Sequence, residues 1–321
     1  MADPHVGTGS PGAGAGDEPT AAGHGGIPWR ELLAEAETRL AAAGLPSPEI
    51  DARRIVERVT GTNGAGLILA MQEPATERAV GFLDMMLARR EAGEPLQYVI
   101  GEWGFRHLDL FVDRRVLIPR PETEQVVEQA LLELDQFVRS GGTPGPPADR
   151  HQVVDLGTGS GAIALSLAVE RADTQVWAVE RSPDATAVAR ANLAGIGRAA
   201  TRVRIVEGSW FDPLPTELHG GCALIVSNPP YVAPSDPLPP EVAEWEPYDA
   251  LVPGASGFEA IDTIVAAAPE WLVPGGTLVV ELAPSQGEDA VAAAWEAGFA
   301  HAETRRDLAG RTRMLVARSP R

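Results

Sequence analysis

The stretch of this chain best suited to chemistry is Ser227-Asn228-Pro229-Pro230-Tyr231, which directly follows the apolar run from Ala223 to Val226. The apolar run predicts a buried strand that ends in a rigid turn, and ligands of open α/β sheets bind at the carboxyl ends of strands. The Asn228 carboxamide oxygen can accept one N–H of a planar amide, and the Pro229 carbonyl can accept the other. Tyr231 can stack on the same plane. The stretch can therefore present a planar nitrogen for attack.

A second candidate site is the glycine-rich segment Asp155-Leu156-Gly157-Thr158-Gly159-Ser160-Gly161, which links a predicted strand to a predicted helix. Glycines let the backbone approach a ligand closely and adopt positive φ, while the amino end of a helix attracts negative charge. Glu180 ends the next predicted strand, where an acidic residue that holds a ribose is expected. The segment predicts a ribose-bearing ligand, but it does not separate S-adenosylmethionine from NAD, because Ala162 also satisfies the looser dinucleotide pattern.

The combination of the two segments favours S-adenosylmethionine as the cofactor. Hydride transfer by NAD needs nothing that resembles residues 227–231, whereas methyl transfer to a planar nitrogen does. The simpler alternatives are an ordinary proline turn at residues 228–230 and a tight strand-to-helix turn at residues 157–161, with Glu180 on the surface.

Strands and helices alternate around these segments, as they do in a doubly wound parallel sheet. Strands are predicted over residues 152–156, 175–179, 203–206, 223–226, 277–282 and 313–317, and helices over residues 162–170, 183–193, 258–271 and 288–297.

The first part of the chain predicts a different organisation. Residues 1–26 are too poor in apolar side chains to order, and predict a disordered tail. Residues 27–93 show helical periodicity and predict a small domain of three helices, the second of which carries Ile50, Ile55, Val56 and Val59. Residues 94–116 predict a connector with a β-hairpin, and residues 117–321 the catalytic domain. A helix that opens at Pro121 is expected to bury Val126, Val127, Ala130, Leu131, Leu134 and Val138.

Composition narrows the class of protein. The 321 residues include 26 Lys and Arg against 45 Asp and Glu, and the resulting charge of -19 argues against nucleic acid as the main partner. The single cysteine, Cys222, excludes a disulfide framework and a Cys-rich metal site. Neither a membrane span of about 20 apolar residues nor a secretory signal is found. A cytoplasmic protein with no membrane association and no metal is expected.

Taken in order, these segments resemble the HemK/PrmC family of peptide chain release factor glutamine methyltransferases, from about Trp29 to Arg318. The most specific motifs are Leu-Ile-Pro-Arg-Pro-Glu-Thr-Glu at residues 117–124, residues 155–165, and residues 227–231. Glu94-Pro-Leu-Gln-Tyr98 and Asp307-Leu-Ala-Gly-Arg311 are similar as well.

The resemblance implies a class I S-adenosylmethionine-dependent methyltransferase, with a Rossmann-like doubly wound sheet, a reversed terminal strand and an N-terminal helical domain. It implies that Gly157 to Gly161 cradle the methionine part of the cofactor, Glu180 holds the ribose and Trp210 lies by the adenine. The helical domain would help to dock a class I release factor, whose Gly-Gly-Gln loop carries the target. The cofactor-binding candidates are Asp155, Gly157, Thr158, Gly159, Ser160, Gly161, Glu180, Trp210 and Asn228, and the catalytic candidates are Asn228, Pro229, Pro230 and Tyr231.

Several interpretations stay open. Ser209 stands before Trp210, where such enzymes often have an acidic residue. The chain is also compatible with an amino-methyltransferase that acts on a ribosomal protein or DNA, or with a cofactor-binding interaction protein that lacks activity. Glu281 faces either the cleft or solvent. Arg120, Glu122 and Glu124 can serve recognition or only stabilise a helix start, and packing is the expected role of Trp103, Phe105 and Trp245.

Overall fold

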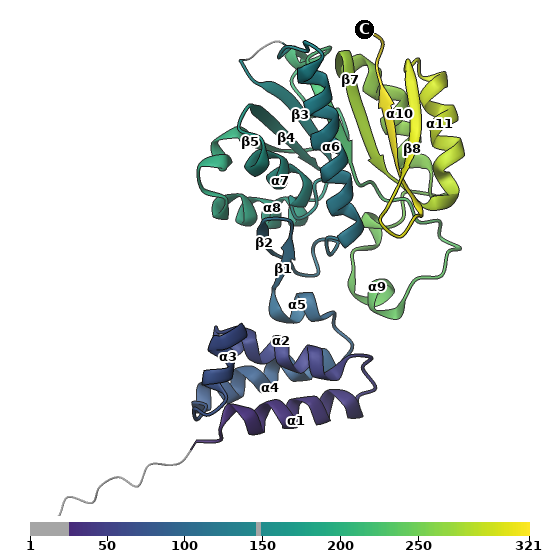
Figure 1. The fold of residues 1–321 in the computed structure, drawn as a ribbon. Coiled ribbons are helices and arrows are strands. Elements are labelled where there is room, and N and C mark those ends of the chain that lie inside the picture. The colour runs from purple at the N-terminus through teal and green to yellow at the C-terminus, as the bar shows by residue number, and fades with distance from the viewer. Residues whose placement is uncertain (1–25, 146–148) are drawn as a thin grey trace, which may run out of the picture.

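The computed structural model describes residues 26–145 and 149–321. It consists of a lobe of helices and a larger lobe built on a twisted sheet (Figure 1). Apart from Gly26, the tail predicted over residues 1–26 lies outside the described residues.

The helical lobe contains five helices: α1 (Trp29–Ala42), α2 (Pro48–Thr60), α3 (Gly64–Ala70), α4 (Glu77–Glu91) and α5 (Leu96–Ile100). The periodicity predictions for α1, α2 and α4 are confirmed, whereas α3 and α5 were not predicted. The apolar stripes of the three long helices meet in one core. Ile50 does not join this core and is 62% exposed, because at about 3.6 residues per turn it lies on the face of α2 opposite Ile55 and Val56.

The segment between the lobes packs against both of them. Val99 of α5 is buried in the core of the helical lobe, whereas its neighbour Tyr98 belongs to the core of the larger lobe. The Tyr98 hydroxyl donates to the carbonyl of Val116 at 2.5 Å. The hairpin predicted here is confirmed, as β1 (Glu102–Phe105) and β2 (Leu108–Phe111) pair in antiparallel fashion.

The larger lobe contains a sheet of seven strands: β3 (His151–Leu156), β4 (Thr174–Glu180), β5 (Val203–Glu207), β6 (Cys222–Ser227), β7 (Leu272–Glu281), β8 (His301–Arg306) and β9 (Thr312–Arg318). Their order is β5-β4-β3-β6-β7-β9-β8. The five strands from β5 to β7 are parallel, and β9 is antiparallel to both of its neighbours. The expected doubly wound sheet with one reversed strand is confirmed, but β8 was not predicted.

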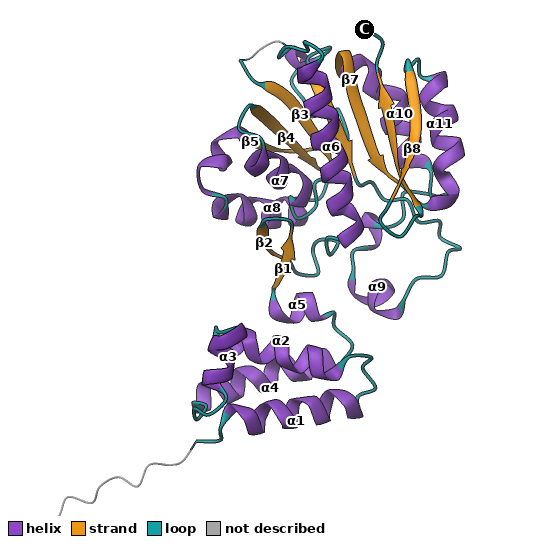
Figure 2. Ribbon diagram, viewed as in Figure 1, coloured by secondary structure: helices purple, strands orange, loops and turns teal. Residues whose placement is uncertain are grey.

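Helices cover both faces of this sheet (Figure 2). One face packs against α6 (Pro121–Arg139), α7 (Ala162–Glu170) and α8 (Pro183–Gly195), and the other against α10 (Glu259–Trp271) and α11 (Gly287–Glu296). Strands buried on both faces are rich in apolar residues, which explains the continuous apolar run from Cys222 to Val226 in β6. Strand β3 is buried at all six positions as well, although His151, Gln152 and Asp155 are polar. Of the side chains expected to be buried by α6, Val138 is instead 37% exposed.

The register of the sheet places the two candidate segments together. Leu156 at the end of β3 pairs with Ser227 at the end of β6, and the Ser227 hydroxyl donates to the Leu156 carbonyl at 2.7 Å. Strand order reverses between these two strands, which is where open α/β sheets bind ligands. In the described part of the chain, no helix has the length and apolar character needed to cross a membrane.

A buried arginine joins the helical lobe to the larger one. Arg90 of α4 is 4% exposed and donates to the Asp51 carboxylate at 2.7 Å and to the Glu94 carbonyl at 3.0 Å. It also donates to the carboxylate of Glu241 at 2.8 Å. Glu241 lies on α9 (Pro240–Trp245), a short helix in the segment between β6 and α10.

We expect Arg90→Ala to lower the free energy of unfolding by about 3–5 kcal/mol, because it leaves the buried Asp51 carboxylate without its cation. Glu241→Ala should cost less than about 1 kcal/mol, since this partner is half exposed. Urea denaturation of both variants tests this difference, and equally small losses would contradict it.

Candidate functional site

A cavity of about 1060 Å³ opens where β3, β4 and β6 end. Its lining brings together most of the cofactor-binding candidates, namely Gly157, Thr158, Gly159, Ser160, Glu180, Trp210 and Asn228. Two candidates are not part of this lining, Asp155 and Gly161. The sequence motifs that are distant along the chain therefore meet around one space.

The glycine loop follows a path that glycine favours. Gly157, Gly159 and Gly161 have φ of 73°, 56° and 89°, in the left-handed region. A Cβ placed on Gly159 would meet no protein atom within 4 Å, so the backbone at this position borders open space. The loop can therefore lie directly against a ligand in the cavity.

The carboxylate of Glu180 is fixed at the end of β4. Its Oε2 accepts from the Gly159 N–H at 2.9 Å and its Oε1 accepts from the Ser182 N–H at 2.8 Å. Each oxygen keeps lone-pair capacity for a further donor. A carboxylate held in this way at the cavity wall suits the two hydroxyls of a ribose.

Asp155 lies beneath the loop. Its side chain is fully buried, and its Oδ2 accepts from the Thr158 hydroxyl at 2.6 Å and from the Ala164 N–H at 3.0 Å. Burial raises the pKa of Asp155 to about 7. Asp155 thus shapes the loop from below, a placement that its position in the motif does not reveal.

Trp210 lines the cavity in a strained backbone conformation. Its φ of 46° is uncommon for a large residue, and its ring lies 3.6 Å from the position of a Cβ on Gly157. The neighbouring Ser209 also lines the cavity. The strain is compatible with a residue that is held in place to form a wall of a binding site.

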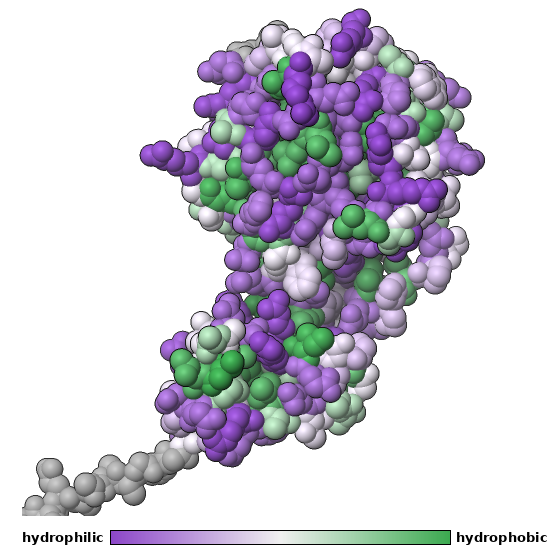
Figure 3. All heavy atoms as spheres, viewed as in Figure 1, coloured by the Kyte–Doolittle hydropathy of each residue, from purple (hydrophilic) through white to green (hydrophobic). Residues whose placement is uncertain are grey.

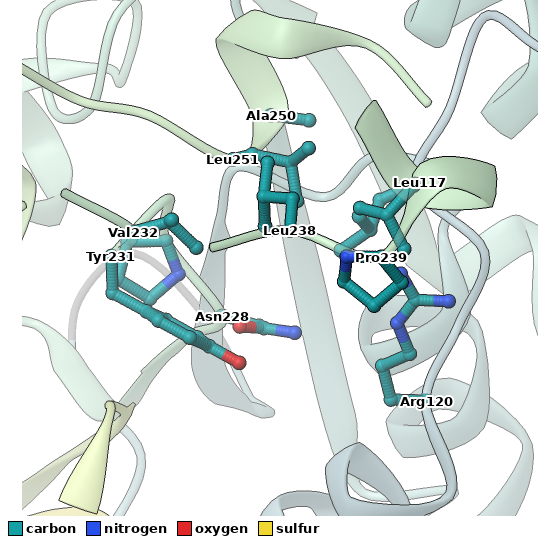
Figure 4. Close-up of a pocket in the computed structure, with 11 residues that line it drawn as sticks. Leu117, Arg120, Asn228, Tyr231, Val232, Leu238, Pro239, Ala250 and Leu251 are labelled. Carbon is teal, nitrogen blue, oxygen red and sulfur yellow. The ribbon is translucent and has the colours of Figure 1, made fainter. Parts of the chain in front are cut away.

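A smaller cavity of about 210 Å³ adjoins the turn that follows β6. Asn228, Pro229 and Tyr231 line it, whereas Pro230 faces the larger cavity. Asn228 borders both. Figure 4 shows Asn228 among the residues that line the smaller cavity, between Tyr231 on one side and Pro239 and Arg120 on the other.

The side chains of Asn228 and Tyr231 are joined through a buried carboxylate. The Asn228 Nδ2 donates to the Thr123 hydroxyl at 3.2 Å, and this hydroxyl donates to Glu281 Oε2 at 2.7 Å. The Tyr231 hydroxyl donates to Glu281 Oε1 at 3.1 Å. Glu281 has no exposed surface, and burial raises its pKa. Neither of the two positions expected for Glu281 is correct: it faces neither solvent nor the cleft, but is buried behind Thr123 and Tyr231 and lines neither cavity.

Sequence reasoning missed Thr123 and left Glu281 undecided, although a signal for both was present. Thr123 lies within the segment 117–124 that opens α6. Glu281 ends the strand next to β6, and its neighbour Val280 pairs with Ser227, so the position of Glu281 beside the Asn228 turn follows from the strand order. The motifs and their spacing do not by themselves specify that order.

The segment that contains α9 forms the far wall of the smaller cavity. Leu238, Pro239 and Val242 line it. Glu246 is buried, and it accepts from Arg120 Nη2 at 2.5 Å and from the Ile118 N–H at 3.2 Å. Burial raises the pKa of Glu246 even though Arg120 opposes this shift.

The other charged residues of segment 117–124 are paired within the protein. Glu122 accepts from Arg311 at 2.8 Å, and Glu124 accepts from the Arg106 N–H at 2.9 Å. Phe105 is buried, and Trp103 and Trp245 are partly buried against the same core. In the described residues, no group of three or more His, Cys, Asp or Glu side chains is arranged to hold a metal ion.

Two family models match the chain. The model described as the PrmC N-terminal domain matches residues 31–101, and the model described as the methyltransferase small domain matches residues 145–239.

Curated relatives match nearly the whole chain. The release factor glutamine methyltransferase of Cereibacter sphaeroides is 38% identical over 295 residues, which cover 90% of this chain and 98% of the relative. The proteins of the same name from Escherichia coli and Deinococcus radiodurans are each 39% identical, and each match covers 90% of this chain and 98% of the relative.

Replacement of Asp155 by Asn is expected to flatten the pH dependence of stability. An unfolded Asp titrates near pH 3.9, so between that value and about 7 the folded protein holds a proton that the unfolded chain lacks. The free energy of unfolding of the native protein therefore falls as pH rises across this range, by up to about 1.4 kcal/mol per pH unit. Asn can accept the same hydrogen bonds and does not titrate.

Urea denaturation at about pH 5 and about pH 7 measures this slope. Asp109→Asn, at an exposed position of β2, serves as the control and should keep the slope of the native protein. If Asp155→Asn also keeps that slope, the account of Asp155 is wrong.

Proposed function

The chain belongs to the family of release factor glutamine methyltransferases, and on this premise we propose its reaction and its site residues. It is an S-adenosylmethionine-dependent methyltransferase with a class I fold. In the proposed reaction, it methylates the side-chain amide nitrogen of the glutamine in the Gly-Gly-Gln loop of a class I peptide chain release factor. Because release factors act on cytoplasmic ribosomes, we place the reaction in the cytoplasm.

The larger cavity fits the cofactor. The open space beside Gly159 accommodates a ligand that lies against the loop, and Glu180 offers two carboxylate oxygens at its edge. The volume of this cavity, about 1060 Å³, suits a nucleoside with an amino acid attached. We assign the glycine loop to the methionine part, Glu180 to the ribose and Trp210 to the adenine. When bound, S-adenosylmethionine supplies a methyl group that is activated for transfer by its sulfonium.

The observation that carries the proposal is the position of Asn228 between the two cavities. Its Nδ2 is bonded to Thr123, so its Oδ1 is left to accept an N–H from a group in the smaller cavity. The Pro229 carbonyl is the second acceptor that we propose. Held by both acceptors, a glutamine amide would lie beside Tyr231 with its nitrogen facing the larger cavity.

The two proposed acceptors compensate for the poor nucleophilicity of an amide nitrogen. The nitrogen lone pair of an amide is delocalised into the carbonyl, so positive charge develops on nitrogen as the new bond forms. Oxygens that are already in place stabilise this charge without reorganisation. The methylated nitrogen then releases a proton to water, and the reaction needs no strong general base.

The helical lobe is the part that we propose for docking of the release factor. It carries large exposed apolar side chains, namely Ile50, Ile68, Leu69, Phe82 and Met85. Figure 3 shows apolar side chains gathered on this lobe. Such side chains at a surface favour contact with another protein.

Asn228→Ala is expected to lower turnover by about 10²–10³, because it removes one of two acceptors that stabilise the developing charge. Cofactor affinity should be largely kept. Single-turnover kinetics and calorimetric titration with the cofactor separate the two quantities, and Ser235→Ala, on the exposed part of the same segment, is the control. Parallel losses of turnover and cofactor affinity would argue against this role of Asn228.

Transfer of labelled methyl to a purified class I release factor tests the function. We expect label on the native factor and none on the same factor with its loop glutamine replaced by alanine. Label on both factors would place the target elsewhere. Absence of label on either factor, with cofactor still bound, would favour another protein substrate.

A further inference from the structure

We propose that Glu281 is a positioning residue that sets which end of the Asn228 carboxamide faces the substrate, acting through Thr123. The inference rests on the proposed function, because it concerns how the acceptor for the substrate amide is oriented. Glu281 ends β7, Thr123 lies in the first turn of α6, and Asn228 follows β6. Three elements distant along the chain thus converge on one carboxylate.

The orientation of Asn228 follows from a count of hydrogens. The Thr123 hydroxyl has a single hydrogen, which it donates to Glu281 Oε2 at 2.7 Å. The Thr123 oxygen then has only lone pairs left, and the group that faces it must be a donor. Asn228 therefore turns its NH2 toward Thr123, at 3.2 Å, and its Oδ1 away.

The second carboxylate oxygen of Glu281 holds Tyr231, the residue proposed to stack on the substrate amide. The Tyr231 hydroxyl donates to Oε1 at 3.1 Å, which holds the ring against rotation out of the smaller cavity. One buried carboxylate thereby orients both the acceptor for the amide N–H and the surface on which the amide plane lies. Gln at position 281 cannot accept from both hydroxyls through separate oxygens, because its amide has one acceptor oxygen and one NH2 donor group.

The cost of burying Glu281 points to function rather than stability. Glu281 is fully buried, and none of the ion pairs among the described residues includes it. Arg313 is the cation whose charge favours the ionised form, and Arg313 itself faces the Asp307 carboxylate at 3.6 Å. A buried carboxylate without a direct cationic partner destabilises the fold, so a residue with only a packing role here would be expected to be apolar.

Glu281→Gln tests the inference because it keeps the shape and replaces one carboxylate oxygen with an NH2 donor. The Gln NH2 can donate to Thr123, which frees the Thr123 hydrogen to donate to Asn228 and allows the carboxamide to reverse. We expect single-turnover methyl transfer to fall about 10- to 100-fold. Cofactor affinity should stay at the native level, and the melting temperature should be unchanged or higher.

Two Thr123 variants separate orientation from packing. Thr123→Val removes the hydroxyl at nearly constant volume and should slow transfer as Glu281→Gln does, whereas Thr123→Ser restores the hydroxyl and most of the rate. The double variant Glu281→Gln, Thr123→Val should be no slower than either single variant, because both act through one path. Glu288→Gln, an exposed position on α11, is the control.

The outcomes distinguish failure of the inference from failure of the proposed function. Native turnover in Glu281→Gln, or additive losses in the double variant, would overturn the inference. If the native protein itself transfers no methyl to a release factor, the proposed function fails, and the inference is judged by NMR of the Asn228 side-chain amide, assigned with Asn228→Ala. The inference is supported if one Asn228 Nδ2 hydrogen exchanges slowly in the native protein and faster in Glu281→Gln. It is overturned if this hydrogen exchanges at the same rate in both proteins.

Discussion

The hydrogen bonds to the buried carboxylate of Glu281 are the constraint on which the arrangement of the site depends. They join the end of β7 to the start of α6 and to the turn after β6 through Thr123 and Tyr231. The Thr123 hydroxyl donates its only hydrogen to this carboxylate, so the Thr123 oxygen can only accept from Asn228. The Asn228 NH2 therefore faces Thr123, and the Asn228 Oδ1 faces the space where a substrate amide would lie.

The sheet determines where this hydrogen-bond network lies, and the network lies beside the two cavities proposed for cofactor and substrate. The register between β3 and β6 brings the glycine loop beside Asn228, so the space proposed for the cofactor adjoins the space proposed for the glutamine. The wall opposite Asn228 belongs to the α9 segment, which is fastened by Glu246 to Arg120 and by Glu241 to Arg90 of the helical lobe. The lobe proposed to dock the release factor is thus in direct contact with the segment that closes the smaller cavity.

Local backbone requirements made much of the fold and site predictable. The positive φ of Gly157, Gly159 and Gly161 and the apolar run of β6 are properties of short segments, so the residue types in those segments predict them. The strand β8 was missed because it lies at an edge and its six residues are largely polar, with no apolar face that a pattern could reveal. Asp155 could not be placed below the loop, and Thr123 could not be connected with Glu281, because both facts depend on strand order and on contacts between distant elements.

The most direct test of this account is a neutron or atomic-resolution structure with S-adenosylhomocysteine and a glutamine-containing release factor peptide. We expect Asn228 Oδ1 and the Pro229 carbonyl each to accept one N–H of the substrate amide, while the Asn228 Nδ2 remains on the Thr123 hydroxyl and Tyr231 lies against the amide plane. A substrate amide bound with its carbonyl oxygen toward Asn228 Nδ2, or a glutamine held away from Asn228, would contradict it.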